Sequence, residues 1–364
     1  MKLSSYVGDI VYTRRQTRVV RVGDICIGGG HPVAVQSMTN CNPHDANALI
    51  EQVRQLASAG CEIVRLTVPD AEAADVFKQV RKKSPVPLVA DIHFDYRMAL
   101  AAIAAGADKI RINPGNIGSE DRVRQVLDAA KAAGIPIRIG VNSGSLPKDL
   151  VVQYGVSAEA LVQAAARYIE LCQRYDFSDL VFSLKASTVT LAIEATRLFA
   201  EEFDFPQHLG ITEAGPGELG IIKSAAGLGG ILALGIGDTI RVSLTGDPVR
   251  EVEVAYRILQ AYGLREYGPT IVSCPTCGRC SVPLEEITAR VSEALKEIKT
   301  PLSVAVMGCA VNGPGEAREA DIGIACGPNG GLLFRHGEII AKLSEDELIP
   351  RLIAEIRQFS GRNN

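Results

Sequence analysis

Short apolar segments alternate with amphipathic helical segments from about residue 33 to residue 262. This alternation is typical of parallel strands joined by crossover helices. Eight strands are predicted, at 33–37, 62–67, 87–93, 108–113, 136–142, 179–185, 207–213 and 238–243. Eight such units indicate a closed TIM (β/α)8 barrel.

A weak internal repeat supports the count of strands. Ala59-Gly60, Ala105-Gly106 and Ala133-Gly134 each end a helical segment shortly before a strand, as a C-terminal glycine cap does. An arginine follows each of these glycines at a similar distance: Arg65, Arg111 and Arg138. The three arginines therefore occupy equivalent places on three strands.

Alternation along each strand separates side chains that face the barrel axis from those that face the helices. It brings toward the axis five cations and a set of smaller polar or acidic groups: Arg65, Arg111, Arg138, Lys185, Arg241, Asn113, Asn142, Ser183, Ser243, Asp91 and His93. Barrel interiors are usually aliphatic, and five unpaired charges there would be costly without a counter-anion. The strand ends therefore predict a pocket for a multiply charged anion such as a diphosphate, because guanidinium groups bind phosphate oxygens bidentately. The alternative is that these cations pair with acids or reach solvent.

Glu213 departs from the alternation. It shares its side of the seventh strand with Leu209 and Ile211, and it lies at the end of that strand, where the chain turns out. A carboxylate beside a ring of cations is either a structural ion-pair partner or a proton donor. The sequence leaves both interpretations open.

A second, smaller domain follows a linker marked by Gly263 and Gly268-Pro269. Its pattern predicts a helix over 284–298, strands at 302–307 and 321–325, a hairpin, and a final helix. The hairpin strands and last helix are predicted at 331–335, 338–342 and 344–358. The chain is thus divided into a barrel, 1–262, and an α+β domain, 263–364.

Composition narrows the class of protein. A net charge of −4 and the absence of Trp argue against a nucleic-acid binder. No apolar run approaches the roughly 18 residues that cross a bilayer, and the N-terminus lacks the apolar centre of a secretory signal. We therefore expect a cytoplasmic protein, in which nine cysteines serve as thiols or metal ligands instead of disulfides.

Four of the cysteines cluster in the second domain, at Cys274, Cys277, Cys280 and Cys309. The first two form a CxxC pair, whose spacing places both sulfurs on one side of a loop, where they can bind one metal centre. The spacing fits an iron–sulfur cluster best, leaves a four-thiolate zinc site possible, and disfavours a redox dithiol because Pro283 interrupts the helix that such a motif requires.

The segments CPxCGR at 274–279 and MGCxVNGPGE at 307–316, behind a cation-lined barrel, resemble the 4-hydroxy-3-methylbut-2-enyl diphosphate synthase family in its two-domain bacterial form. The resemblance covers essentially the whole chain. It implies a [4Fe–4S] cluster on Cys274, Cys277 and Cys309, with Glu316 as a displaceable fourth ligand. Cys280 departs from the family pattern, in which Thr commonly occupies that place.

The same resemblance implies an isoprenoid-pathway substrate, 2-C-methyl-D-erythritol 2,4-cyclodiphosphate, which is reduced by two electrons to 1-hydroxy-2-methyl-2-butenyl 4-diphosphate. It assigns Glu213 as the acid and implies a reduced flavodoxin or ferredoxin as electron donor and a head-to-tail homodimer. The residues implied to bind the diphosphate are Arg65, Arg111, Asn113, Arg138, Asn142, Lys185, Arg241 and Ser243.

Two other functions fit parts of the sequence. A phosphate-binding lyase or aldolase would use Lys185 as a Schiff base and carry a structural zinc in the second domain. A non-enzymatic protein would use a zinc-stabilised second domain as an interaction module. Iron and labile sulfide content separates both from an iron–sulfur enzyme.

Overall fold

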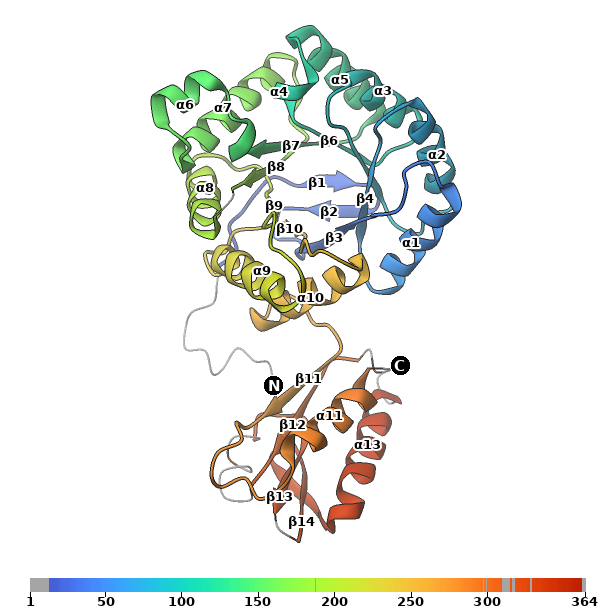
Figure 1. Ribbon diagram of the computed structural model, residues 1–364, viewed down its shortest axis with the longest axis vertical. Coiled ribbons are helices and arrows are strands. Elements are labelled where there is room, and N and C mark those ends of the chain that lie inside the picture. The colour runs from blue at the N-terminus through green and yellow to red at the C-terminus, as the bar shows by residue number, and fades with distance from the viewer. Residues whose placement is uncertain are drawn as a thin grey trace. The chain divides into compact units, whose positions relative to one another are not determined.

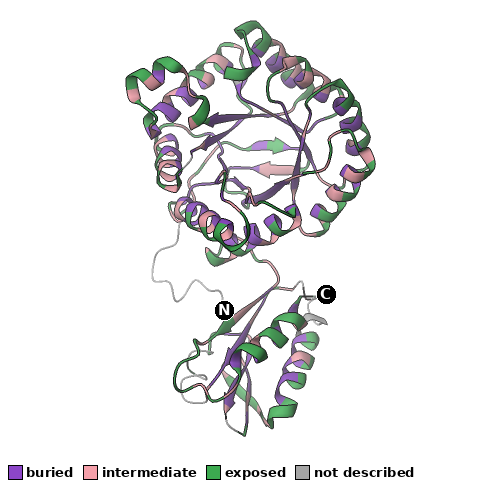
Figure 2. Cartoon of the chain, in the orientation of Figure 1, coloured by how far each residue is buried: buried purple, intermediate pink, exposed green. Residues whose placement is uncertain are grey.

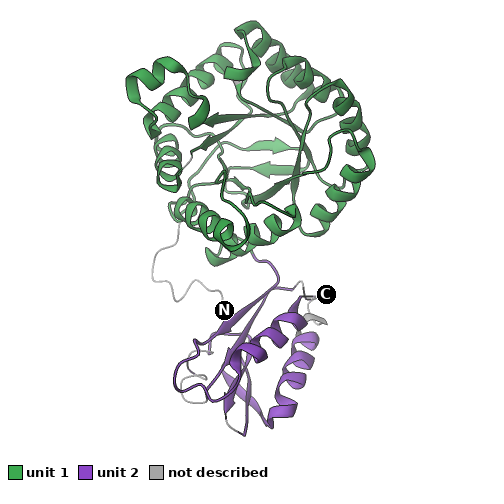
Figure 3. Cartoon of the chain, in the orientation of Figure 1, with its two compact units in different colours: residues 1–265 green, residues 266–364 purple. Residues whose placement is uncertain are grey.

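The structure is a computed structural model that describes residues 13–186, 188–296, 298, 300–309, 315, 318–327 and 329–361. The chain divides into two compact units, residues 1–265 and 266–364 (Figure 3). Each unit has its own sheet and its own core. Among the helices of the described residues, none is long and apolar enough to cross a membrane.

Eight parallel strands form the barrel of the first unit (Figure 1). In chain order they are β3 (Ala34–Met38), β4 (Ile63–Thr67), β5 (Leu88–Asp91), β6 (Lys109–Ile112), β7 (Ile137–Asn142), β8 (Leu180–Lys185), β9 (His208–Leu209) and β10 (Thr239–Ile240). Strand β3 pairs with both β4 and β10, while β8 and β9 meet through a single bridge between Phe182 and Gln207. The predicted barrel is confirmed.

Helices surround the barrel and bury one face against it, so that the strands are buried and the outer helix faces are exposed (Figure 2). They are α1 (Ala46–Ser58), α2 (Ala71–Arg81), α3 (Tyr96–Ala104), α4 (Pro114–Ile117), α5 (Glu120–Ala133), α6 (Lys148–Tyr154), α7 (Ala158–Arg174), α8 (Val189–Glu202), α9 (Gly217–Leu232) and α10 (Pro248–Ala261). Local sequence fixes many of their ends. Asp45, Asp70 and Ser157 accept hydrogen bonds from first-turn amides, and Gly134 ends α5 in the left-handed conformation, at φ 65°.

The last two barrel strands are shorter than predicted. The alternating pattern extends to residues 213 and 243, yet β9 ends at Leu209 and β10 at Ile240. Residues 212–213 form a turn instead, so strand alternation does not decide where Glu213 points.

An antiparallel hairpin that the pattern does not predict precedes the barrel, formed by β1 (Val20–Val22) and β2 (Ile25–Ile27). Its apolar side chains Val22 and Ile27 pack against Ala34, Ile63 and Val89, which come from the starts of β3, β4 and β5. The hairpin therefore closes the amino-terminal end of the barrel, opposite the strand ends that carry the predicted pocket.

The second unit has a five-stranded sheet in the order β11-β12-β13-β14-β15. Its elements are β11 (Pro269–Ser273), α11 (Leu284–Leu295), β12 (Leu302–Met307), β13 (Ile322–Gly327), β14 (Gly330–Arg335), β15 (Glu338–Leu343) and α13 (Glu345–Gly361). Both helices pack on the sheet through an apolar core. Strand β11 is missing from the prediction, because the glycines before it indicate only a linker.

Candidate functional site

Strand alternation places the predicted cations inside the barrel. Register pairs Arg65 with Met38 and Arg111 with Arg138, so the two members of each pair are neighbours across adjacent strands. Arg65 is 5% exposed and Arg138 is 0% exposed, which agrees with side chains that point to the axis. A Cβ on Gly140 would lie 2.9 Å from Arg111 Nη2, so the missing side chain leaves room for that guanidinium.

Asp91 is the acid at the centre of this group. One of its carboxylate oxygens accepts a hydrogen bond from Arg111 Nη1 at 3.1 Å, and the other lies 3.8 Å from Arg65 Nε. Burial raises the pKa of Asp91, but the two guanidinium groups outweigh it and lower that pKa to about 2. Asp91 is therefore an ionised partner that holds two of the arginines in place.

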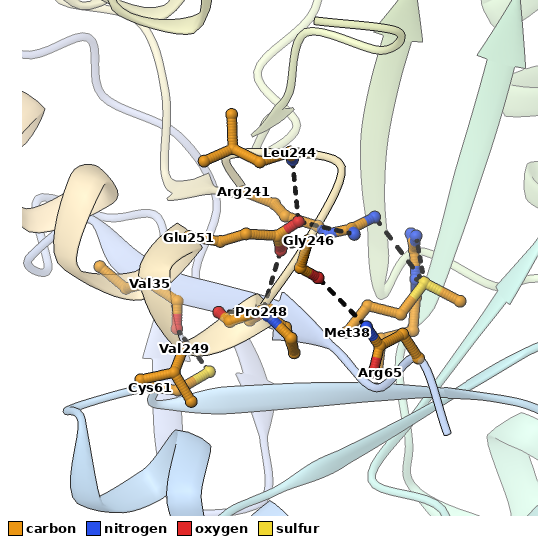
Figure 4. Close-up of polar contacts among 12 residues, drawn as sticks. Val35, Met38, Cys61, Arg65, Arg241, Leu244, Gly246, Pro248, Val249 and Glu251 are labelled. Atoms are coloured by element: carbon orange, nitrogen blue, oxygen red, sulfur yellow. Dashed lines mark hydrogen bonds and ion pairs between the residues drawn. The ribbon is translucent and has the colours of Figure 1, made fainter. Parts of the chain in front are cut away.

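A second carboxylate, Glu251 at the start of α10, holds Arg241 (Figure 4). Its two oxygens lie 3.4 Å from Arg241 Nε and Nη2, and one accepts the Leu244 amide at 3.0 Å. Arg241 and Arg65 both reach the sulfur of Met38. Glu251 thus links the segment that follows β10 to helix α10.

The alternative that the sequence left open, pairing with acids, therefore holds for three of the five cations. Arg65 and Arg111 share Asp91, and Arg241 pairs with Glu251. The other two, Arg138 and Lys185, have no carboxylate partner in the described part of the chain. Burial, followed by the surrounding arginines, lowers the pKa of Lys185 and of Arg138 well below their ordinary values. The barrel interior therefore keeps an excess of positive charge that a bound anion would relieve.

Lys109 is a sixth cation that the predicted set misses. It lies two positions before Arg111 on β6, is 0% exposed, and its pKa falls to about 7 through burial and then Arg138. The same alternation that selects Arg111 and Asn113 also selects Lys109. The sequence pattern therefore already indicated Lys109, which lies two residues closer to the amino-terminal end of β6 than Arg111.

The smaller predicted groups lie at the carboxyl ends of the strands. Asn113 Oδ1 accepts the Gly115 amide at 3.2 Å, and its Nδ2 donates to Ser145 Oγ at 3.1 Å. Asn142 Oδ1 accepts the Gly144 amide at 3.3 Å. Both asparagines thus shape the loops that follow their strands, and Ser243 is half-buried beyond β10.

Glu213 is exposed on the turn after β9 and has φ 57°, in the left-handed region that a residue with a side chain adopts only at some cost. Its carbonyl accepts a hydrogen bond from Lys223 Nζ at 3.0 Å, which holds the turn against α9. The side chain makes no ion pair within the described residues, so it is available to another group.

The four clustered cysteines predicted in the second unit lie on the two loops that follow β11 and β12. Strands β11 and β12 are parallel and pair Ser273 with Val306, so the loops that leave them begin side by side. The Gly308 amide donates to Cys274 Sγ at 3.3 Å, and the Ser281 amide donates to the Gly308 carbonyl at 3.4 Å. The two predicted motifs are therefore joined through Gly308, next to Cys309.

Cys280 belongs to the same cluster of thiols. A Cβ on Gly308 would lie 2.5 Å from Cys280 Sγ, and that sulfur contacts the Val282 carbonyl at 3.3 Å. Cys277 is exposed at the tip of its loop, while Cys309 is half-buried. Glu316 lies outside the described residues, and within them no group of three or more potential ligands is arranged around one metal position.

The chemistry of this edge suits a metal centre with sulfur ligands. Thiolates are the preferred ligands of iron–sulfur clusters and of zinc, and two short loops at one sheet edge supply them here. The hydrogen bond from Gly308 to Cys274 Sγ is of the kind that stabilises a cluster thiolate. The residues present therefore fit such a group.

Fold and site together define a two-domain protein with a cation-lined TIM barrel and an α+β domain that presents clustered thiols. Residues 17–256 match the family described as the GcpE TIM-barrel domain, and residues 270–358 match the GcpE protein C-terminal domain. The chain belongs to the GcpE family, as the resemblance predicts.

The curated relatives are similar over almost their full length. The 4-hydroxy-3-methylbut-2-en-1-yl diphosphate synthase (flavodoxin) of Thermodesulfovibrio yellowstonii is 54% identical over 95% of this chain and 99% of its own. Proteins of the same name from Anoxybacillus flavithermus and Listeria monocytogenes are each 54% identical. They cover 95% and 94% of this chain and 96% and 94% of their own lengths.

Solved structures resemble the chain in fold. Yersinia pestis dihydropteroate synthase has a TM-score of 0.50 at 14% identity, covering 68% of this chain and all of its own. A truncated 3-deoxy-D-arabino-heptulosonate 7-phosphate synthase from Thermotoga maritima has the same TM-score at 15% identity, covering 68% of this chain and 94% of its own. Both show a shared architecture and nothing about the reaction.

Proposed function

We propose that this chain is an iron–sulfur oxidoreductase that converts 2-C-methyl-D-erythritol 2,4-cyclodiphosphate to 1-hydroxy-2-methyl-2-butenyl 4-diphosphate. The observation that carries the proposal is the group of cations that faces the barrel axis, of which Arg138 and Lys185 lack carboxylate partners among the described residues. The names of the full-length relatives support the same activity. They do not favour a zinc-containing lyase that uses Lys185 as a Schiff base.

The barrel binds and orients the diphosphate. Asp91 and Glu251 hold Arg65, Arg111 and Arg241 in fixed positions, so little conformational entropy is lost when these arginines meet phosphate oxygens. Arg138 and Lys185 supply the uncompensated charge. Asn113, Asn142 and Ser243 add polar groups at the rim, where the loops close around the ligand.

Glu213 is proposed as the acid that protonates the oxygen leaving as water. Its exposed side chain on a strained turn is free to donate a proton at the mouth of the barrel. Cys274, Cys277 and Cys309, with Glu316, would hold a [4Fe–4S] cluster, which when bound would pass on, one at a time, the two electrons that the reduced donor protein supplies. Glu316 remains a sequence-based assignment.

Partners follow from the same relatives. Their names include flavodoxin, which supports a reduced flavodoxin as electron donor, and ferredoxin is a second candidate of the same kind. We also propose a head-to-tail homodimer, in which the thiol-bearing domain of one chain serves the barrel of its partner. A cytoplasmic location stays a prediction.

Anaerobic purification tests the proposal directly. We expect about four irons and four labile sulfides per chain, and conversion of the cyclodiphosphate with reduced flavodoxin. Cys274→Ser should lose iron and sulfide, whereas Cys172→Ser, a buried thiol in the barrel unit, should keep both. Zinc without sulfide, or a full cluster without turnover of the cyclodiphosphate, would contradict the proposal.

A further inference from the structure

Polar side chains continue inside the barrel below the diphosphate pocket. Lys109 and Thr239 lie two positions before Arg111 and Arg241, so they point to the axis about 7 Å deeper along their strands. Gln36 lies two positions before Met38, whose sulfur contacts Arg65 and Arg241. Thr239 pairs in register with His208, and their side chains hydrogen bond at 2.6 Å. These four residues are called the floor layer.

Polar atoms around this layer have no protein partner in the described part of the chain. Arg138 and Lys109 are both 0% exposed, yet all three guanidinium nitrogens and Lys109 Nζ are unpaired. Both amide atoms of Gln36 and the hydroxyl of Ser183 are buried and unpaired as well. Buried polar groups are almost always hydrogen bonded, so these atoms require partners that the described protein groups do not supply.

The uncompensated charge of Arg138 indicates which kind of ligand would bind here. Arg138 keeps its proton even when buried, and Asp91 and Glu251 are committed to the other three arginines. A water molecule would satisfy hydrogen bonds but leave the charge uncompensated. We propose that a small monovalent anion of halide size binds between Arg138 and Lys109, in a site deeper than that of the diphosphate.

Closure of the barrel limits the size of this anion. Val22 and Ile27 of the hairpin pack under Ala34, Ile63 and Val89, so the floor layer is sealed from the amino-terminal side. A diphosphate would enter from the opposite end, past the rim groups Asn113, Asn142 and Ser243 and past Lys185 at the end of β8. Burial and Arg138 lower the pKa of Lys109 to about 7, and a neighbouring anion favours its charged form. The proposal needs the cation-lined barrel but does not rest on the proposed reaction.

Thermal unfolding of the full-length protein tests the site, with sodium chloride compared against sodium gluconate at equal ionic strength. A bound halide should raise Tm in a saturable way, because it binds only the folded state. Lys109→Met should weaken the apparent chloride affinity about tenfold or more, since it removes one charged donor. Lys83→Met, at an exposed position, should respond like the wild type.

Bromide in wild-type crystals provides a second measurement that does not depend on the folding of a variant. An anomalous peak between Lys109 Nζ and the Arg138 guanidinium is expected, and it should persist when pyrophosphate is added. Water-like density without an anomalous signal would overturn the proposal. Loss of the bromide on addition of pyrophosphate would also overturn it, because the halide would then occupy the diphosphate layer.

Discussion

Asp91 sets the electrostatic balance of the barrel interior. It is 3% exposed and contacts two arginines, and its pKa of about 2 lies below the ordinary value of 3.8. A carboxylate whose pKa is lower in the folded state stabilises the fold above the unfolded pKa, and this contribution disappears as the pH falls through the folded pKa. The relevant pH window is therefore about 4 to 2.

The free energy of unfolding should fall by about 2 kcal/mol over this window through Asp91 alone. Urea denaturation of the wild type and of Asp91→Asn at a series of pH values measures the difference. The variant should be less stable at neutral pH and should lack this component of the acid dependence. Parallel curves for the two proteins would show that Asp91 is not an ionised partner.

Glu213→Gln should lower turnover about 100-fold or more, because the amide cannot donate the proton that the leaving oxygen requires. Iron content and substrate affinity should be unchanged, since the side chain has no ion pair within the described residues. Glu218→Gln, an exposed residue in the first turn of α9, is the matched control. Full activity of Glu213→Gln would remove the proposed role.

At the scale of elements, both candidate sites lie where parallel strands end. The cations lie on β4, β6, β7 and β8 or directly after β10, and the loops after β11 and β12 carry the thiols. Parallel pairing brings the carboxyl ends of neighbouring strands to one edge, so residues far apart in sequence become neighbours. Gly308 is the point at which the two thiol-bearing loops touch.

Gly308→Ala should disrupt the thiol cluster. The new Cβ would lie 2.5 Å from Cys280 Sγ, which forces the loops apart and costs about 1–3 kcal/mol of stability. We expect reduced iron and sulfide content after anaerobic reconstitution. Cys280→Ala in the same chain removes the clashing sulfur and should restore much of the content. A double variant no better than Gly308→Ala would contradict this packing.

At the scale of the whole molecule, the cations and the thiols belong to different compact units. A reaction that needs both must combine a barrel with a thiol-bearing domain, either from one chain or from two. Sequence resemblance favours two chains. Complementation distinguishes these arrangements without any knowledge of the interface.

Lys185→Ala and Cys277→Ser variants, each inactive alone, should regain activity when they are co-refolded in equal amounts. If subunits pair at random and each site uses both chains, about a quarter of the wild-type activity is expected. Two preparations of the same variant, mixed in the same way, should stay inactive. Absence of recovery in verified mixed dimers would favour a site built from one chain.

Much of this architecture follows from local patterns. Apolar periodicity located the starts of all eight barrel strands, β3 to β10, within one residue. Glycine caps and aspartate caps explain several of the helix ends. Alternation on β6 and β7 identified Arg111 and Arg138 as interior residues, because a two-residue period is a property of the strand itself. The hairpin before the barrel was missed because three-residue strands carry little periodic signal.

The sequence by itself determined the barrel, the interior position of its cations, the clustering of the cysteines and the GcpE family. Tertiary structure decided which charges are paired: Asp91 takes Arg65 and Arg111, Glu251 takes Arg241, and Arg138 is left without a carboxylate among the described residues. Periodicity reports the face on which a side chain lies, whereas an ion pair depends on distances across the barrel that only the closed sheet fixes.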